Sequence, residues 1–191
     1  MSGFATLFAD HRDQLRRPSE PIVRSAELAA GCRLSLTRTW GTGPTIVIAG
    51  CNPSNADGQR DDPTTCREMA FANRWGFGAL VKVNVYPVIA ATTSMGALHA
   101  WRSIYPATWE RNIDRAAGLL ARAGAAWAAW GALVPGEDLG AWIAGVARRL
   151  GRPVDWQCLG VTTSGAPKHT LARGRHRIPD DARLQPWRGW G

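Results

Sequence analysis

The stretch TIVIAGCNPSNADGQRDD, residues 45–62, joins a short apolar segment to a long polar loop. The segment 45–50 is typical of a strand that is buried on both faces, as in a parallel sheet. The loop that follows is rich in amides and carboxylates. Because ligands of parallel α/β sheets bind outside the carboxyl ends of the strands, this stretch predicts both a fold class and the place of a site.

Strand and helix patterns alternate on both sides of this stretch, which favours a three-layer α/β/α domain with a central, mainly parallel four-stranded sheet. Residues 1–191 are expected to form one domain. Residues 1–31 are predicted as a helical, arginine-rich lead-in, and residues 160–191 as a catalytic loop and basic tail. Strands are expected at 33–40, 45–50, 79–85, 125–130 and 154–159, helices at 62–75, 107–122 and 137–150, and a loop at 86–105.

The composition is strongly basic. The chain has 23 Lys and Arg against 15 Asp and Glu, a net charge of +8, and Lys82 and Lys168 are its only lysines. Arginine favours bidentate contacts with phosphate, so DNA is the expected partner. The alternative is a basic surface that serves solubility. Of the ten tryptophans, some are expected in the core and others could stack on bases.

The sequence has no apolar run of membrane-spanning length, and residues 1–17 lack a secretory apolar segment, so a cytoplasmic monomer without membrane contact is expected. The cysteines have no CxxC pair and no zinc-like spacing. Reduced, mostly buried thiols are therefore expected, with no metal and no cofactor. The cysteines are Cys32, Cys51, Cys66 and Cys158.

Three polar residues of the loop 51–62 are candidates for the site, and a fourth, Asp61, is not. Asn52, held by the following proline, could orient a water, or it could form an Asx turn. Asp57 could act as a general base toward water, or it could be a turn former. Asp62 is expected to cap the helix, with contacts to a bound base as the alternative. Asp61 is expected in solvent.

Two further candidates lie beyond this loop. Asn84 interrupts an apolar strand and could read the edge of a base, or it could be a satisfied core amide. His169 follows a Gly- and Pro-containing loop and could stabilise an anionic leaving group, or it could be structural. The basic residues around it fit phosphate contacts, or they form a solvated tail. They are Lys168, Arg173, Arg175 and Arg177.

Together these groups suit hydrolysis of an N-glycosidic bond. Water must approach one face of a sugar with an oxocarbenium-like transition state, while the departing base takes up negative charge. The base must first be flipped out of the stack into a pocket.

Four segments in this order resemble a prokaryotic family catalogued as a domain of unknown function, which in turn resembles a distant branch of the uracil-DNA glycosylase superfamily. The resemblance covers about residues 33–188. The segments are AGCNPSNAD (49–57), DDPTTCREMAFANRWGFGALVKVNVYP (61–87), AAWAAWG (125–131) and CLGVTTSGAPKHTL (158–171).

The resemblance implies a uracil-DNA glycosylase-like fold and a DNA glycosylase activity. It implies that Asn52 with Pro53 holds the catalytic water, that Asn84 reads the base and that His169 stabilises the leaving base. The pocket tyrosine of some superfamily members has no counterpart at Ser54. A small residue there leaves room for a bulky, sugar-bearing hydroxymethylcytosine of phage DNA, as in related anti-phage glycosylases.

Two other functions remain open from the sequence. One is a non-catalytic nucleic-acid-binding module, in which arginine and tryptophan supply phosphate and stacking contacts. The other is a hydrolase of free modified nucleotides that uses the same crevice.

Overall fold

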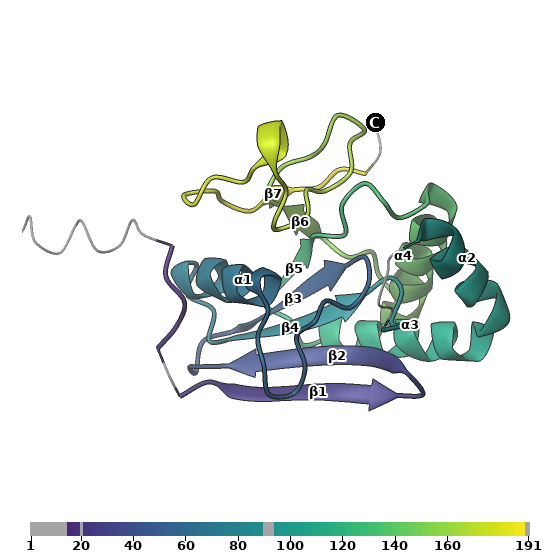
Figure 1. The fold of residues 1–191 in the computed structure, drawn as a ribbon, viewed down its shortest axis with the longest axis horizontal. Helices are drawn as coiled ribbons and strands as arrows, with labels where there is room; N and C mark the ends of the chain where they lie inside the picture. The colour runs from purple at the N-terminus through teal and green to yellow at the C-terminus, as the bar shows by residue number, and fades with distance from the viewer. Residues whose placement is uncertain (1–14, 20, 90–93, 190–191) are drawn as a thin grey trace, which may run out of the picture.

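The described residues, 15–19, 21–89 and 94–189 of a computed structural model, form one seven-stranded mixed sheet and four α-helices. The strands run in the spatial order β1-β2-β4-β3-β5-β6-β7 (Figure 1). They are β1 (Val23–Ala29), β2 (Cys32–Thr39), β3 (Thr45–Gly50), β4 (Ala79–Asn84), β5 (Ala125–Ala128), β6 (Trp156–Cys158) and β7 (Gln185–Pro186). The helices are α1 (Pro63–Arg74), α2 (Met95–Ile104), α3 (Pro106–Leu120) and α4 (Gly136–Leu150).

The centre of the sheet is the parallel set β4-β3-β5-β6, in which the register pairs Gly50 with Asn84 and Ala49 with Ala128. The four expected parallel strands are therefore present. The sheet is wider than the four strands expected, because β2, which was itself predicted as a strand, and the unpredicted β1 and β7 extend it by antiparallel pairing.

The predicted helical lead-in is wrong for residues 23–29, which form β1; residues 1–14 lie outside the described part of the chain. Ala30 and Gly31 have φ angles of 47° and 73°, as a tight hairpin turn requires. This turn lets β1 pair along β2, from Val23 with Thr39 to Ala29 with Cys32. A local hairpin has overridden the helical propensity of the segment.

The predicted loop 86–105 contains α2, which the sequence analysis missed. Ser94 caps this helix by accepting a hydrogen bond from the backbone N–H of Ala97. The other helices confirm the prediction within two residues at each end. Asp62 caps α1, as expected, by accepting from the N–H of Thr65 at 2.7 Å.

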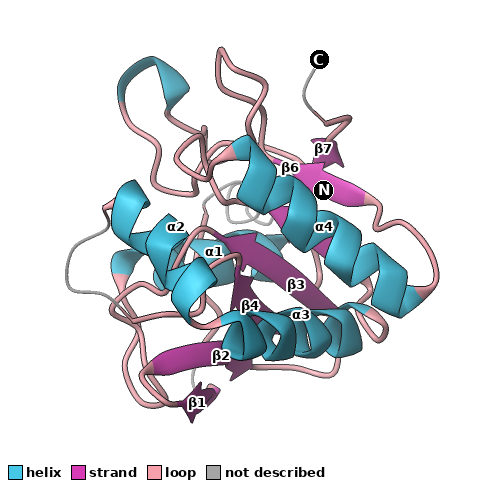
Figure 2. Ribbon diagram, turned by 90° about the vertical axis from the view of Figure 1, so that its right-hand side faces the viewer, coloured by secondary structure: helices cyan, strands magenta, loops and turns pink. Residues whose placement is uncertain are grey.

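Helices cover both faces of the sheet. On one face, Met69 and Phe71 of α1 pack against Ile48 and Trp127. On the other, α3 and α4 lie in front of the strands in Figure 2 and bury a larger cluster against them. That cluster includes Trp109, Ile113, Trp142 and Val146. None of the helices that the structure describes combines the length and the apolar surface that crossing a bilayer requires.

A close backbone approach before β4 generates a stability prediction. A Cβ added to Gly78 would lie 2.3 Å from the backbone nitrogen of Gly43, whereas one added to Gly118 in α3 would meet no described atom within 4 Å. Gly78→Ala should lower the free energy of unfolding by about 1–3 kcal/mol or more. Gly118→Ala, the matched control, should raise it by about 0.5–1 kcal/mol. Urea unfolding measures both; equal stability of the two variants would contradict the packing described.

Candidate functional site

A cavity of about 290 Å³ opens at the carboxyl ends of β3 and β5, where the sequence predicted a site. Its volume is near the lower end of the range for small-molecule pockets, about 300–1,000 Å³. We call it the base-sized cavity. Three predicted site residues, Asn52, Ser54 and His169, meet in its wall. The other lining residues are Gly50, Cys51, Glu68, Lys82 and residues 129–133.

A buried ion pair forms part of this wall. Nζ of Lys82 lies 2.9 Å from Oε2 of Glu68, and the two side chains are 4% and 1% exposed. Thr170 donates a hydrogen bond from its Oγ1 to Oε1 of Glu68 at 3.1 Å. Burying two charges is costly unless they are paired, so such a pair in a cavity is a functional candidate.

Sequence reasoning missed both members of this pair. The pattern Thr65-x-x-Glu68 is also that of a capping box, which would place Glu68 at the start of the helix. In the structure Asp62 is the cap and Glu68 points to Lys82 instead. The available signal was Lys82 itself, a cation within an otherwise apolar strand.

His169 lies at the mouth of the cavity. Its Nδ1 accepts a hydrogen bond from the N–H of Leu171 at 3.2 Å. The neutral ring therefore bears its proton on Nε2, which is free to donate to a ligand. Desolvation lowers the pKa of His169 below its ordinary value; Glu68 opposes this change and Lys82 adds to it. The ring retains an exposed edge, as expected for a residue at an opening.

Asn84 lies directly behind the cavity wall. It is fully buried, and neither its Nδ2 nor its Oδ1 has a hydrogen-bond partner among the described residues. A Cβ on Gly50, a lining residue, would lie 2.7 Å from this Oδ1, so only glycine fits between Asn84 and the cavity; Asn84 itself is not a lining residue. An unpaired buried amide costs about 1–3 kcal/mol. The alternative of a satisfied core amide does not hold within the described residues.

Trp130 is a lining residue of the cavity whose ring packs in the core cluster beneath α3 and α4. It is 1% exposed, and its Nε1 has no partner among the residues that the structure describes. Its ring meets Trp156 and Trp187 edge-on at centroid distances of 5.2 and 5.1 Å. The expectation that some tryptophans belong to the core is confirmed by Trp127 and Trp142, both fully buried.

Two buried arginines of β2 hold the loop that follows β3. Arg33 donates from Nη1 to the carbonyl oxygens of Ser54, at 3.2 Å, and Ala56. Arg38 donates from Nη2 to the carbonyl oxygens of Asp57 at 2.6 Å and Arg60 at 3.0 Å. Part of the arginine excess is thus structural, rather than available to an anionic partner.

The aspartates of this loop make structural contacts instead of lining the cavity as catalytic residues would. Asp61 was expected in solvent, but it is 6% exposed and paired with Arg38 at 2.5 Å. The carboxylate of Asp57 is exposed and accepts N–H bonds from Gln59 and Arg60, both at 2.7 Å. These bonds lower the pKa of Asp57. Neither Asp57 nor Asp62 lines the base-sized cavity, and Asp57 has the geometry of the turn former.

The basic tail divides into separate groups. Arg173 and Arg177 line a second cavity of about 410 Å³ next to α1. Arg175 instead donates to Oγ1 of Thr163 at 3.4 Å. Lys168 packs near Gly160, where an added Cβ would lie 3.7 Å from its Cε.

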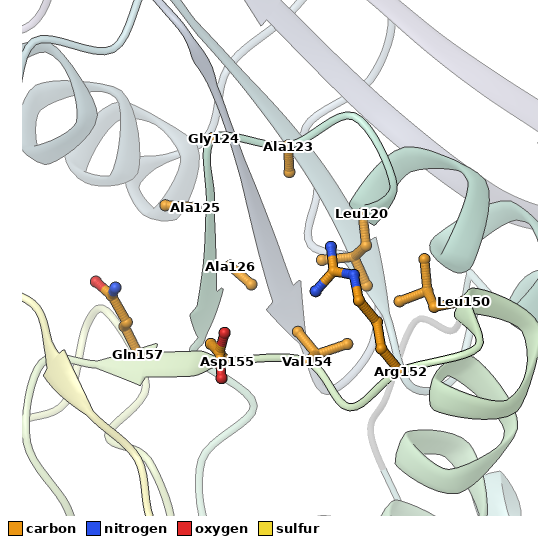
Figure 3. Close-up of a pocket in the computed structure, with 10 residues that line it drawn as sticks. All are labelled: Leu120, Ala123, Gly124, Ala125, Ala126, Leu150, Arg152, Val154, Asp155 and Gln157. Atoms are coloured by element: carbon orange, nitrogen blue, oxygen red, sulfur yellow. The ribbon is translucent and has the colours of Figure 1, made fainter.

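Another cavity, of about 270 Å³, lies at the opposite end of the sheet (Figure 3). The side chains of Arg152, Asp155 and Gln157 lie around it, beside the amino ends of β5 and β6. It contains none of the predicted site residues.

The thiols fit the expectation: Cys32, Cys51, Cys66 and Cys158 are all free, and burial raises the pKa of Cys51 to about 11.

The fold and the base-sized cavity define an α/β domain with a polar, ligand-sized pocket at the carboxyl ends of its parallel strands. The chain belongs to the family described as "Protein of unknown function (DUF1643)", whose profile matches residues 33–171. This match confirms the expected membership of a family of unknown function. No curated protein and no solved structure matches the chain, so the likeness to uracil-DNA glycosylases stays a prediction.

The environment of His169 generates a prediction. The NMR signal of its ring should titrate at a lower pH than that of a histidine in an unfolded peptide, because desolvation lowers its pKa. Glu68→Gln should move the midpoint lower still, since it removes the larger of the two attractions, from Glu68 and Asp62, that raise this pKa. A midpoint above the ordinary value, or an upward shift in the variant, would contradict the assigned environment.

Proposed function

We propose that the protein is a DNA glycosylase that hydrolyses the N-glycosidic bond of a modified base and leaves an abasic site. The observation that supports it most is the base-sized cavity, in which the Glu68–Lys82 pair meets His169 beside the unpaired amide of Asn84. The resemblance of the chain to the uracil-DNA glycosylase superfamily implies the reaction class, and it also implies the three-layer fold of that superfamily.

The base enters the cavity after it is flipped from the stack. Asn84 offers one donor and one acceptor, enough to read a Watson–Crick edge. Trp130, another lining residue, has an indole N–H that is unpaired within the described residues. The amide of Asn84 and the N–H of Trp130 would each gain a hydrogen bond when a base binds. This gain favours the occupied cavity over the empty one.

Glu68 is the best candidate to activate water. Among the described residues that line the cavity, it is the one carboxylate. Lys82 and Thr170 each occupy one of its oxygens and fix its orientation, yet each oxygen retains a lone pair. Asn52, at the same wall, can orient the water. This assigns to Glu68 the role that the sequence suggested for Asp57.

His169 and Lys82 would stabilise the negative charge on the departing base. The Nε2–H of neutral His169 can donate to the leaving base, and the ammonium of Lys82 adds a positive charge in the same wall. A base that leaves as an anion is stabilised most in such a desolvated site, where screening is weak.

The proposed substrate is a bulky 5-substituted pyrimidine, sugar-bearing hydroxymethylcytosine in phage DNA. Ser54 lines the cavity with a short side chain, and the volume of about 290 Å³ is not reduced by an aromatic ring at this position. Such an enzyme would act in the cytoplasm as an antiviral defence, without a membrane partner.

The first test compares the two candidate carboxylates. Glu68→Gln should reduce the single-turnover rate of base release by about 10²–10⁴, because it removes a positioned base. Asp57→Asn is the matched control and should retain the rate, since asparagine also forms Asx turns. Asn52→Ala should lose base release and keep DNA affinity. Base release is read as alkali-labile breaks in DNA with glucosylated hydroxymethylcytosine. If Asp57→Asn reduced the rate of base release and Glu68→Gln retained it, Asp57 would be the general base instead of Glu68.

The second test concerns selectivity. Ser54→Tyr should slow release of glucosylated hydroxymethylcytosine much more than release of uracil, because the added ring takes up space in the wall of the cavity. Competition between the two DNA substrates in one reaction gives the ratio of kcat/KM. An equal loss on both substrates, or a wild-type enzyme that prefers uracil, would sink the proposed specificity.

A further inference from the structure

The second cavity, which we call the arginine cavity, lies beside the base-sized cavity. It is lined by Pro63 and Arg67 of α1, by residues 170–174 and by Arg177 and Ile178. Two pairs of consecutive residues separate the cavities. Arg67 and Thr170 line the arginine cavity, whereas their neighbours in the chain, Glu68 and His169, line the base-sized cavity. The hydrogen bond from Thr170 to Glu68 joins the two pairs within this thin wall.

The arginine cavity has positive charge in excess of its local partners. Arg67 is partly neutralised, because its Nη2 donates to Asp180 and to the carbonyl oxygen of Ile178, both at 2.7 Å. Arg173 and Arg177, which flank the short 3₁₀ turn Gly174–His176, have no side-chain partner within the described residues. Two exposed guanidinium groups that line the same cavity can bind an oxyanion with one or two negative charges, because arginine forms bidentate hydrogen bonds with such groups.

We propose that the arginine cavity binds a phosphate of the nucleotide whose base occupies the base-sized cavity, and that this phosphate belongs to a DNA strand. The inference rests on the proposed function and adds a defined subsite to it. The phosphate fixes the nucleotide on one side of the wall while Glu68 and His169 act on the other. In this view Arg175 is not part of the subsite, although it belongs to the same tail.

The test uses a matched pair of double variants in the full chain. Arg173→Gln with Arg177→Gln removes two charges from the arginine cavity, and Arg175→Gln with Arg183→Gln removes two charges outside it. Binding to an unmodified fluorescent DNA duplex is measured over a range of NaCl concentrations, with thermal melting as the control for folding. The cavity variant should bind about tenfold more weakly and lose about one from the salt slope. The control should change little.

Free nucleotide is the second arm. Calorimetry with deoxycytidine and its 5′-monophosphate measures what a phosphate adds to binding. Equal weakening of DNA binding in both double variants would overturn the subsite in favour of a diffuse basic surface. A loss confined to the monophosphate, with DNA binding intact, would overturn the DNA source. Neither readout requires base release, so an inactive wild-type enzyme would refute the proposed glycosylase without refuting the subsite.

Discussion

The site depends on the capture of one loop by Arg33 and Arg38. A loop after a buried strand has several carbonyl oxygens that no neighbouring strand can pair. These two guanidinium groups, 1% and 0% exposed as residues, donate to four of those oxygens, on residues 54, 56, 57 and 60. The charge of Arg38 is balanced by Asp61 at 2.5 Å. Because the loop is held by its backbone, Asn52 and Ser54 keep their places in the wall of the cavity.

The Glu68–Lys82 pair imposes a second constraint, because it joins elements that are distant in sequence. It connects α1 to β4, and through Thr170 it also connects them to the C-terminal segment. Removing either charge would leave the other one buried without a partner, a cost of about 3–5 kcal/mol. The pair therefore has a structural role as well as the proposed catalytic one, and kinetic effects of variants must be read beside their stability.

The sequence predicted the parallel strands because apolar runs between turn residues identify buried strands well. It also predicted that Asn52, Ser54 and His169 would meet, since the carboxyl ends of parallel strands share one edge of a sheet. It could not find Glu68, because the direction of a helical side chain is set by packing across the sheet rather than by spacing along the chain. For the same reason, the buried arginines of β2 could not be distinguished from surface ones.

The charges around the cavity wall explain why a neutral His169 is useful. With Glu68 and Lys82 paired and His169 uncharged, these three side chains have no net charge, so in the proposed reaction a neutral base would enter without electrostatic penalty. Bond cleavage then separates charge, with a cation on the sugar and an anion on the base. Glu68 can stabilise the first, while Lys82 and the Nε2–H of His169 can stabilise the second. In the proposed reaction, the ion pair that is inert toward the ground state would thus favour the transition state, which is the condition for catalysis.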